Sequence, residues 1–164
     1  MCKRLKKRVK KLNSINSDIP KAESVIYIMS RDQRVSGNHA LIAAQKFALE
    51  EDLPLIVFFN LYPKVRNRLK NQYIWMLEGL KELEKKLRDK NIAFNITVGK
   101  AVENYKFIEN EYAPAAFFFD FSPLRGPRSV KKTFAQSTKT PCFVVDTHNI
   151  IPVWEASEKE EYAA

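Results

Sequence analysis

Apolar residues gather in five short runs along the chain, separated by longer segments of mixed character. The runs lie at 25–29, 55–59, 92–98, 115–119 and 142–145. Four of them are almost continuously apolar, which is typical of strands buried on both faces of a parallel sheet. In the run at 92–98, large apolar residues alternate with smaller or polar ones, so we place this third strand at an edge.

The segments between the runs have the spacing of helices. Apolar residues recur at helical intervals within 41–48, 69–87 and 102–112. Prolines at 54, 114 and 141 stand where a helix must have ended before the second, fourth and fifth strands begin. The pattern predicts an α/β fold, doubly wound and Rossmann-like, with a five-stranded parallel sheet in the order 3-2-1-4-5 and helices on both faces.

Two loops of this predicted fold carry polar side chains to one place. Ligands of such sheets bind beyond the carboxyl ends of the strands at the switch point, here strands one and four. Segment 30–34 leaves strand one and segment 120–125 leaves strand four, and each combines a carboxylate, an arginine and a hydroxyl. With Phe121 as an apolar wall, the cluster suits a planar polar ligand. Alternatively, Asp32 and Arg34 are solvated loop charges and Asp120 caps a turn.

The sequence disfavours the common phosphate and catalytic motifs. Its four glycines form neither a G-x-G-x-x-G nor a Walker loop. Gly37 precedes a predicted helix, where Ser36 or Asn38 could cap the helix or help to hold an anion weakly. His148 could pair with Ser122, but neither residue lies in a nucleophile-elbow context, and His39 falls at a helix start, where a surface or capping role is expected. Three acids at strand ends could hold magnesium: Asp32, Asp120 and Asp146. We predict no catalytic residue and no metal site.

Charge and length add two expectations. The 164 residues suit one domain, and the net charge of +9 is concentrated at the amino terminus. Removing the seven basic residues there leaves 28 − 7 = 21 basic residues against 19 acidic ones. Residues 1–22 are therefore predicted to be a basic flexible arm that binds polyanions non-specifically through Lys3, Arg4, Lys6, Lys7, Arg8, Lys10 and Lys11. The widely separated Cys2 and Cys142, with no signal peptide or membrane-length apolar run, predict reduced thiols and a cytoplasmic protein.

Five segments together closely resemble the amino-terminal α/β domain of class II cyclobutane pyrimidine dimer (CPD) DNA photolyases. They are YIMSRDQR at 27–34, QYIWMLEGL at 72–80, DFSPLR at 120–125, DTHN at 146–149 and PVWEASEKEEYAA at 152–164. One departure is GNHA at 37–40, where the family usually has D-N-W-A. The resemblance extends from about Val25 to the last residue.

The resemblance implies a seat for a light-harvesting antenna chromophore, of the 8-hydroxydeazaflavin type rather than a folate. Carried over by motif, Met29, Ser30, Arg31 and Asp32 would line one side, and Asp120, Phe121, Ser122 and Arg125 the other. Residues 23–149 would form the antenna-binding domain. Residues 150–164 would lead to a flavin-binding helical domain, which holds FAD and which this chain lacks. We therefore expect a weakly bound or absent chromophore, and participation in light-driven DNA repair only with the flavin-binding half.

The expected partners follow from the same picture. They are the helical domain, through it damaged DNA, and no membrane. The apolar segment with Ile150, Ile151, Val153 and Trp154 would be exposed without that domain, which predicts a homodimer or a covering partner chain. Two alternatives stay open at this point, namely a nucleotide-binding module of the universal-stress type and a basic accessory protein that associates with DNA.

Overall fold

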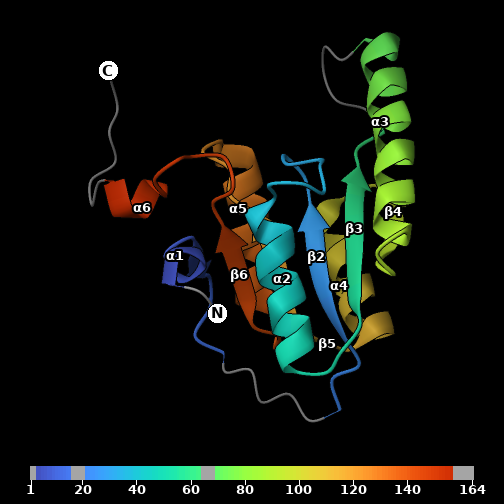
Figure 1. Ribbon diagram of the computed structural model, residues 1–164. Helices are drawn as coiled ribbons and strands as arrows, with labels where there is room; N and C mark the ends of the chain where they lie inside the picture. Colours follow the sequence, from blue (N-terminus) through green and yellow to red (C-terminus); the bar gives the residue numbers. More distant parts are fainter. Residues whose placement is uncertain (1–2, 16–20, 64–68, 157–164) are drawn as a thin grey trace.

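The computed structural model describes residues 3–15, 21–63 and 69–156 (Figure 1). Helices and strands alternate through most of this range. In chain order the elements are α1 (Lys3–Lys6), β1 (Val9–Lys11), β2 (Ser24–Met29), α2 (His39–Glu50), β3 (Leu55–Leu61), α3 (Lys70–Arg88), β4 (Ala93–Val98), α4 (Ala101–Tyr112), β5 (Pro114–Asp120), α5 (Arg125–Ser137), β6 (Cys142–Val145) and α6 (Val153–Ala156).

The central part of the sheet has the predicted topology. The strand order is β1-β6-β5-β2-β3-β4, and the pairs from β6 to β4 are all parallel. Read from the other edge, β4-β3-β2-β5-β6 is the predicted order 3-2-1-4-5, with β4 at the edge as its alternating pattern indicated. The doubly wound arrangement is thereby confirmed, and the strand order reverses between β2 and β5.

The sheet has six strands rather than five, because the amino-terminal segment adds one. β1 pairs antiparallel with β6, with Val9 opposite Val145 and Lys11 opposite Phe143. The expectation of a flexible arm is therefore wrong over residues 3–15. Its basis was charge alone, which overlooked three apolar side chains between the lysines. Leu5 is buried, and Val9 and Leu12 pack against the core. Pairing also satisfies backbone groups that an open β6 edge would leave exposed.

Two apolar cores lie on opposite faces of the sheet. Alternate residues of β2 face opposite ways, with Tyr27 in the core beneath α2 and α3 and Ile28 in the core beneath α4 and α5. Phe117 packs edge-on against Phe134 of α5, with ring centroids 4.9 Å apart. Figure 1 shows α2 on one side of the sheet and α4 and α5 on the other. The two cores hold the strand ends, and hence the loops at the carboxyl edge, in fixed positions.

Helix α5 has no counterpart among the predicted helical segments. Its buried residues are few, and they are concentrated at Lys131, Phe134 and Ala135. Pro127 in its first turn is compatible with a helix start, since the amide hydrogens there need no intrahelical acceptor. Among the helices of the described ranges, none has both the length and the apolar character needed to cross a membrane.

Candidate functional site

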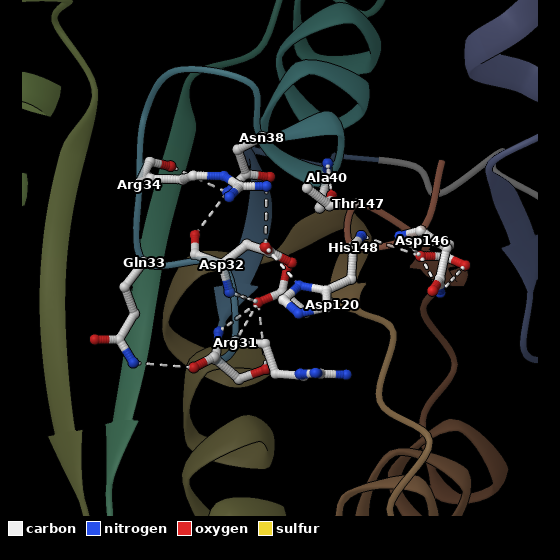
Figure 2. Close-up of polar contacts among 12 residues, drawn as sticks. Arg31, Asp32, Gln33, Arg34, Asn38, Ala40, Asp120, Asp146, Thr147 and His148 are labelled. Atoms are coloured by element: carbon white, nitrogen blue, oxygen red, sulfur yellow. Dashed lines mark hydrogen bonds and ion pairs between the residues drawn. The ribbon is translucent and has the colours of Figure 1, made fainter. Parts of the chain in front are cut away.

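The two loops at the switch point meet on the carboxylate of Asp120, at the end of β5. One oxygen, Oδ2, accepts hydrogen bonds from the backbone amides of Ser30, Arg31 and Asp32 at 2.7, 2.8 and 3.2 Å. Figure 2 shows these bonds converging on the carboxylate. Asp120 is completely buried, so each bond replaces one to water. The prediction that the turns carrying Arg31 and Asp120 meet is confirmed, and Asp120 is the residue that joins them.

The other carboxylate oxygen continues the network below the loop. Tyr27 donates its hydroxyl hydrogen to Oδ1 of Asp120 at 2.6 Å, and that hydroxyl accepts from Nδ2 of Asn38 at 2.9 Å. Burial and the neighbouring Asp120 raise the pKa of Tyr27 well above its usual value. Asn38 also caps α2 by accepting from the amide of Leu41. Of the two proposed caps, Asn38 is the one observed, and Gly37 before it has the positive φ of 66° that glycine tolerates.

Beside this network a pocket opens at the carboxyl edge of β2, β3 and β5. Its volume is about 620 Å³, within the range of small-molecule sites. Most of its wall is apolar or aromatic, and a few polar groups stand among these side chains. The lining residues are Ile28, Met29, Ser30, Arg31, Gln33, Phe59, Asn60, Leu61, Tyr62, Met76, Tyr105, Phe119, Ser122, Pro123, Leu124, Gly126, Pro127, Val130 and Lys131.

One lining residue is a buried cation. Lys131, on α5, is 8% exposed and donates from Nζ to the carbonyl oxygen of Asp120. The pKa of Lys131 is lowered to about 8, chiefly by burial and also by nearby Arg31 and Arg128, while Asp120 acts in the opposite direction. Among the described residues, no carboxylate forms an ion pair with this amine. The pocket therefore contains a buried amine that feels the charge of Asp120 but has no direct anionic partner among the described residues.

Four of the eight sequence-predicted residues line this pocket, and four do not. Met29, Ser30, Arg31 and Ser122 belong to its wall. Asp120 lies beneath the loop. The other three residues lie outside the lining. Asp32 contacts Arg34 and His148, and Phe121 packs on Trp154 with ring centroids 5.7 Å apart. Arg125 is exposed at the start of α5. A pocket is therefore present at the predicted switch point. The polar residues that the sequence singled out there mostly stabilise the loops around the pocket.

The residues missed by sequence reasoning come from neighbouring elements. Phe59 to Leu61 end β3 and Tyr62 follows it, and because β3 lies beside β2, the predicted strand order already contained the signal that these residues reach the same crevice. Lys131 could not be found in this way, because no helix was predicted at α5. Tyr105 of α4 was assigned only to a helix face, and the length of its side chain carries it to the pocket.

The alternative chemistries considered from sequence have no support in this geometry. Oδ1 of Asp32 lies 3.2 Å from Nδ1 of His148, whereas Ser122 accepts a bond from the amide of Leu124 at 3.4 Å. His148 and Ser122 therefore have different partners, and the described residues show no hydrogen bond between them. The carboxylate of Asp146 accepts from the amides of His148, Asn149 and Val153. In residues 3–15, 21–63 and 69–156, no cluster of three or more histidine, cysteine or acidic side chains could hold a metal ion.

Basic residues near the amino terminus form hydrogen bonds and an ion pair with the segment that follows β6. The guanidinium of Arg8 donates to the carbonyls of Asp146, Asn149 and Ile150 at 2.9, 2.7 and 2.6 Å. Lys7 pairs with Glu155 at 2.7 Å. Arg8 is thus committed to the fold, and the exposed cations that remain for a polyanion include Arg4, Lys6, Lys10 and Lys11. Cys2 lies outside the described residues, and Cys142 is a buried free thiol.

The predicted exposure of the carboxyl-terminal apolar segment is observed in part. Ile150 and Ile151 are 93% and 61% exposed, and Val153 is 44% exposed. Trp154 instead packs on Phe121 and donates from Nε1 to the carbonyl of Lys7 at 2.8 Å. Residues 157–164, the remainder of the expected linker, lie outside the described residues.

Comparisons of the amino-acid sequence with known proteins identify one family. The DNA photolyase family model matches residues 25–164. A deoxyribodipyrimidine photo-lyase of Arabidopsis thaliana is 36% identical over 142 residues, covering 85% of this chain and 29% of the relative. The chain spans 27% to 35% of the lengths of the curated relatives that it matches.

Solved structures show the same fold. A bacterial class III photolyase from Agrobacterium tumefaciens superposes with a TM-score of 0.63 at 19% identity, covering 82% of this chain and 27% of that one. A universal stress protein in complex with cAMP superposes with a TM-score of 0.53 at 16% identity, covering 77% of this chain and 99% of that one. At such identities the likeness concerns the fold alone.

Proposed function

Because the chain belongs to the DNA photolyase family, we propose that its pocket is the seat of a light-harvesting antenna chromophore in a class II CPD photolyase. The observation that carries this proposal is the pocket of about 620 Å³ at the switch point, formed by the same loops that carry the family-like motifs. Its class II assignment is supported by those motifs. We further propose that repair of damaged DNA requires a flavin-binding helical portion that holds FAD.

The pocket has the properties that an antenna requires. Such a pigment absorbs light and passes the excitation to a second chromophore, so its site needs a fixed orientation and exclusion of water rather than an acid or a base. Aromatic and aliphatic side chains from β2, β3 and β5 supply rigid walls. The buried network around Asp120 fixes loop 30–34, which forms the edge of the slot. These residues fit a planar ring better than a polyphosphate.

The pocket is open on one side, which sets the expected affinity. Leu124 and Tyr62 line it and are 66% and 42% exposed. A ligand would therefore remain partly in contact with solvent, and a site that buries less of its ligand binds it more weakly. We propose an 8-hydroxydeazaflavin-type pigment rather than a folate, held weakly by the 164-residue chain.

A direct binding measurement tests the proposal. The purified protein would be titrated separately with 8-hydroxy-5-deazaflavin, with methenyltetrahydrofolate and with cAMP, following pigment fluorescence polarisation or, for cAMP, calorimetry. The variant Leu124→Trp narrows the mouth of the pocket, and Leu49→Trp is its control, since Leu49 is similarly exposed (75%) on α2 outside the lining. We expect deazaflavin binding that Leu124→Trp weakens by about tenfold, the equivalent of a modest overpacking cost.

The outcomes separate the candidate functions. Binding of neither pigment, or equal binding to both tryptophan variants, would refute an antenna seat in this pocket. Preference for the folate would retain the seat and exclude the deazaflavin. Tight binding of cAMP without pigment binding would favour the nucleotide-binding alternative, for which the cited universal stress protein structure is the precedent.

A further inference from the structure

The pocket contains one buried group whose charge the proposed pigment seat does not by itself explain. The amine of Lys131 is held at the floor by its bond to the carbonyl of Asp120, where β5 ends. An ammonium group has three hydrogens to donate, and one of them is used here. The structure shows no second hydrogen-bond acceptor for this amine among the described residues, and a buried cation costs free energy unless an anion accompanies it.

Among the described residues, the one carboxylate that acts on this amine is that of Asp120, which raises the pKa of Lys131 but forms no ion pair with it. The carboxylate of Asp120 already accepts from three backbone amides and from the hydroxyl of Tyr27. From the loop after β2 comes Arg31, and from α5 itself comes Arg128, both of which are cations that act on Lys131. Across the pocket, α4 contributes Tyr105, whose pKa is raised by burial, so that its hydroxyl stays neutral.

A ligand can therefore supply the direct anionic partner that the described residues do not. We propose that Lys131 selects the anionic form of the pocket's aromatic ligand, by pairing its ammonium group with an ionised hydroxyl on the ring. This inference rests on the proposed function, because it assigns a specificity-determining residue to the same seat. A charge-assisted hydrogen bond in a water-poor site is among the stronger polar contacts, whereas a ring without the hydroxyl would leave the buried amine uncompensated.

The acidity of Lys131 gives the pairing a definite pH range. With its pKa lowered to about 8, the amine of the free pocket is mostly protonated near neutrality and mostly neutral at about pH 9.5. Affinity for an anionic ring should then fall as the pH rises above 8, because the positive partner is lost. Affinity for a ring with no ionisable hydroxyl should not fall over this range.

Two matched ligands and two matched variants test the inference on the full chain. The ligands are 8-hydroxy-5-deazaflavin and the corresponding 5-deazaflavin that lacks the 8-hydroxyl, titrated near pH 7 and at about pH 9.5. The variants are Lys131→Met and Lys132→Met. Lys132 is the exposed neighbour on α5, so its substitution makes the same change in charge away from the pocket. Circular dichroism of each variant establishes that it is folded.

We expect the wild type and Lys132→Met to prefer the hydroxylated ring by about 10- to 100-fold near pH 7, the usual range for one charge-assisted hydrogen bond. Lys131→Met should lose this preference, and the wild type should lose most of it at about pH 9.5. The wild-type comparison needs no variant, so it decides the matter even if Lys131→Met does not fold. Equal binding of both rings to the wild type would overturn the inference and leave the pigment seat intact. Binding of neither ring would refute both.

Discussion

The substitution Asp120→Asn tests whether one buried carboxylate holds the crevice together. It removes the negative charge and replaces one oxygen by an NH2 group, with almost no change in volume. The carboxylate now accepts from three loop amides on one oxygen and from the Tyr27 hydroxyl, at 2.6 Å, on the other. An amide has only one oxygen, so one of these two sides must lose its acceptor.

The expected cost can be worked out from these contacts. If the amide oxygen faces the loop, three charge-assisted bonds become neutral ones, each weaker by about 1 kcal/mol, and the Tyr27 hydrogen loses its acceptor at about 1–3 kcal/mol. Part of this loss is offset because a buried charge no longer has to be desolvated. We therefore expect the free energy of unfolding to fall by about 2–4 kcal/mol. Tyr27→Phe should be less costly, and the two changes should couple by about 1 kcal/mol or more in a double-mutant cycle.

Urea unfolding followed by circular dichroism measures these differences, provided that the slope with denaturant is unchanged between variants. Asp89→Asn is the control, because Asp89 is an exposed aspartate at the end of α3. A loss of less than 1 kcal/mol for Asp120→Asn, or a loss equal to that of Asp89→Asn, would contradict the reasoning. So would additivity with Tyr27→Phe, since the two side chains share one hydrogen bond.

Further predictions concern the amino-terminal strand, the buried lysine and the exposed segment. Arg8→Ala should remove three bonds to carbonyls, destabilise the protein by about 1–3 kcal/mol and speed amide hydrogen exchange in β1, while the exposed Lys10→Ala should not. Lys131→Met should stabilise the protein near pH 7 by up to about 3 kcal/mol. Between the folded pKa of about 8 and the unfolded value of 10.5, the unfolded state binds more protons at Lys131 than the folded state does, so the wild type becomes more stable as the pH rises. The stability gain of Lys131→Met over the wild type should therefore shrink through that pH range. Urea unfolding measures the trend, which the control Lys132→Met should not show. If Ile150 and Ile151 form a self-association surface, sedimentation should show dimers that the double change to serine reduces, and a single-chain mass for the wild type at high concentration would contradict it.

The parallel part of the sheet could be predicted because its signals are local and redundant. Each central strand is an apolar run with a proline or polar loop at its boundary, and each strand is buried on both faces as its composition requires. Strand β1 lacks such redundancy. It has three residues, two of them lysines, and it exists only because the edge of β6 offers backbone partners and the core accepts Val9. A pairing that depends on a partner more than 130 residues away leaves little trace in the local pattern.

The candidate site could be located from the sequence more accurately than its residues could be assigned. Strand order fixes where loops meet, so the segments with Arg31 and Asp120 were placed correctly. The role of an aspartate within such a loop depends on which donors surround it, and this is decided by backbone geometry. Asp120 faces inward to three amides, whereas Lys131 reaches the pocket from a helix with few apolar residues. Side-chain direction at the ends of elements is the information that the pattern lacks.

The use of the carboxylates also bears on what kind of chemistry the crevice supports. A general base must keep a free lone pair within reach of a reacting proton. Asp120 and Asp146 give their oxygens to backbone amides, and the buried Asp32 faces Arg34 and His148 rather than the pocket. The described residues of the pocket wall offer apolar surface, hydroxyls, amides and two cations, Arg31 and Lys131, and of these two cations Lys131 is the buried one. Such a wall can position a ring and match its charge, which is what the proposed antenna seat requires.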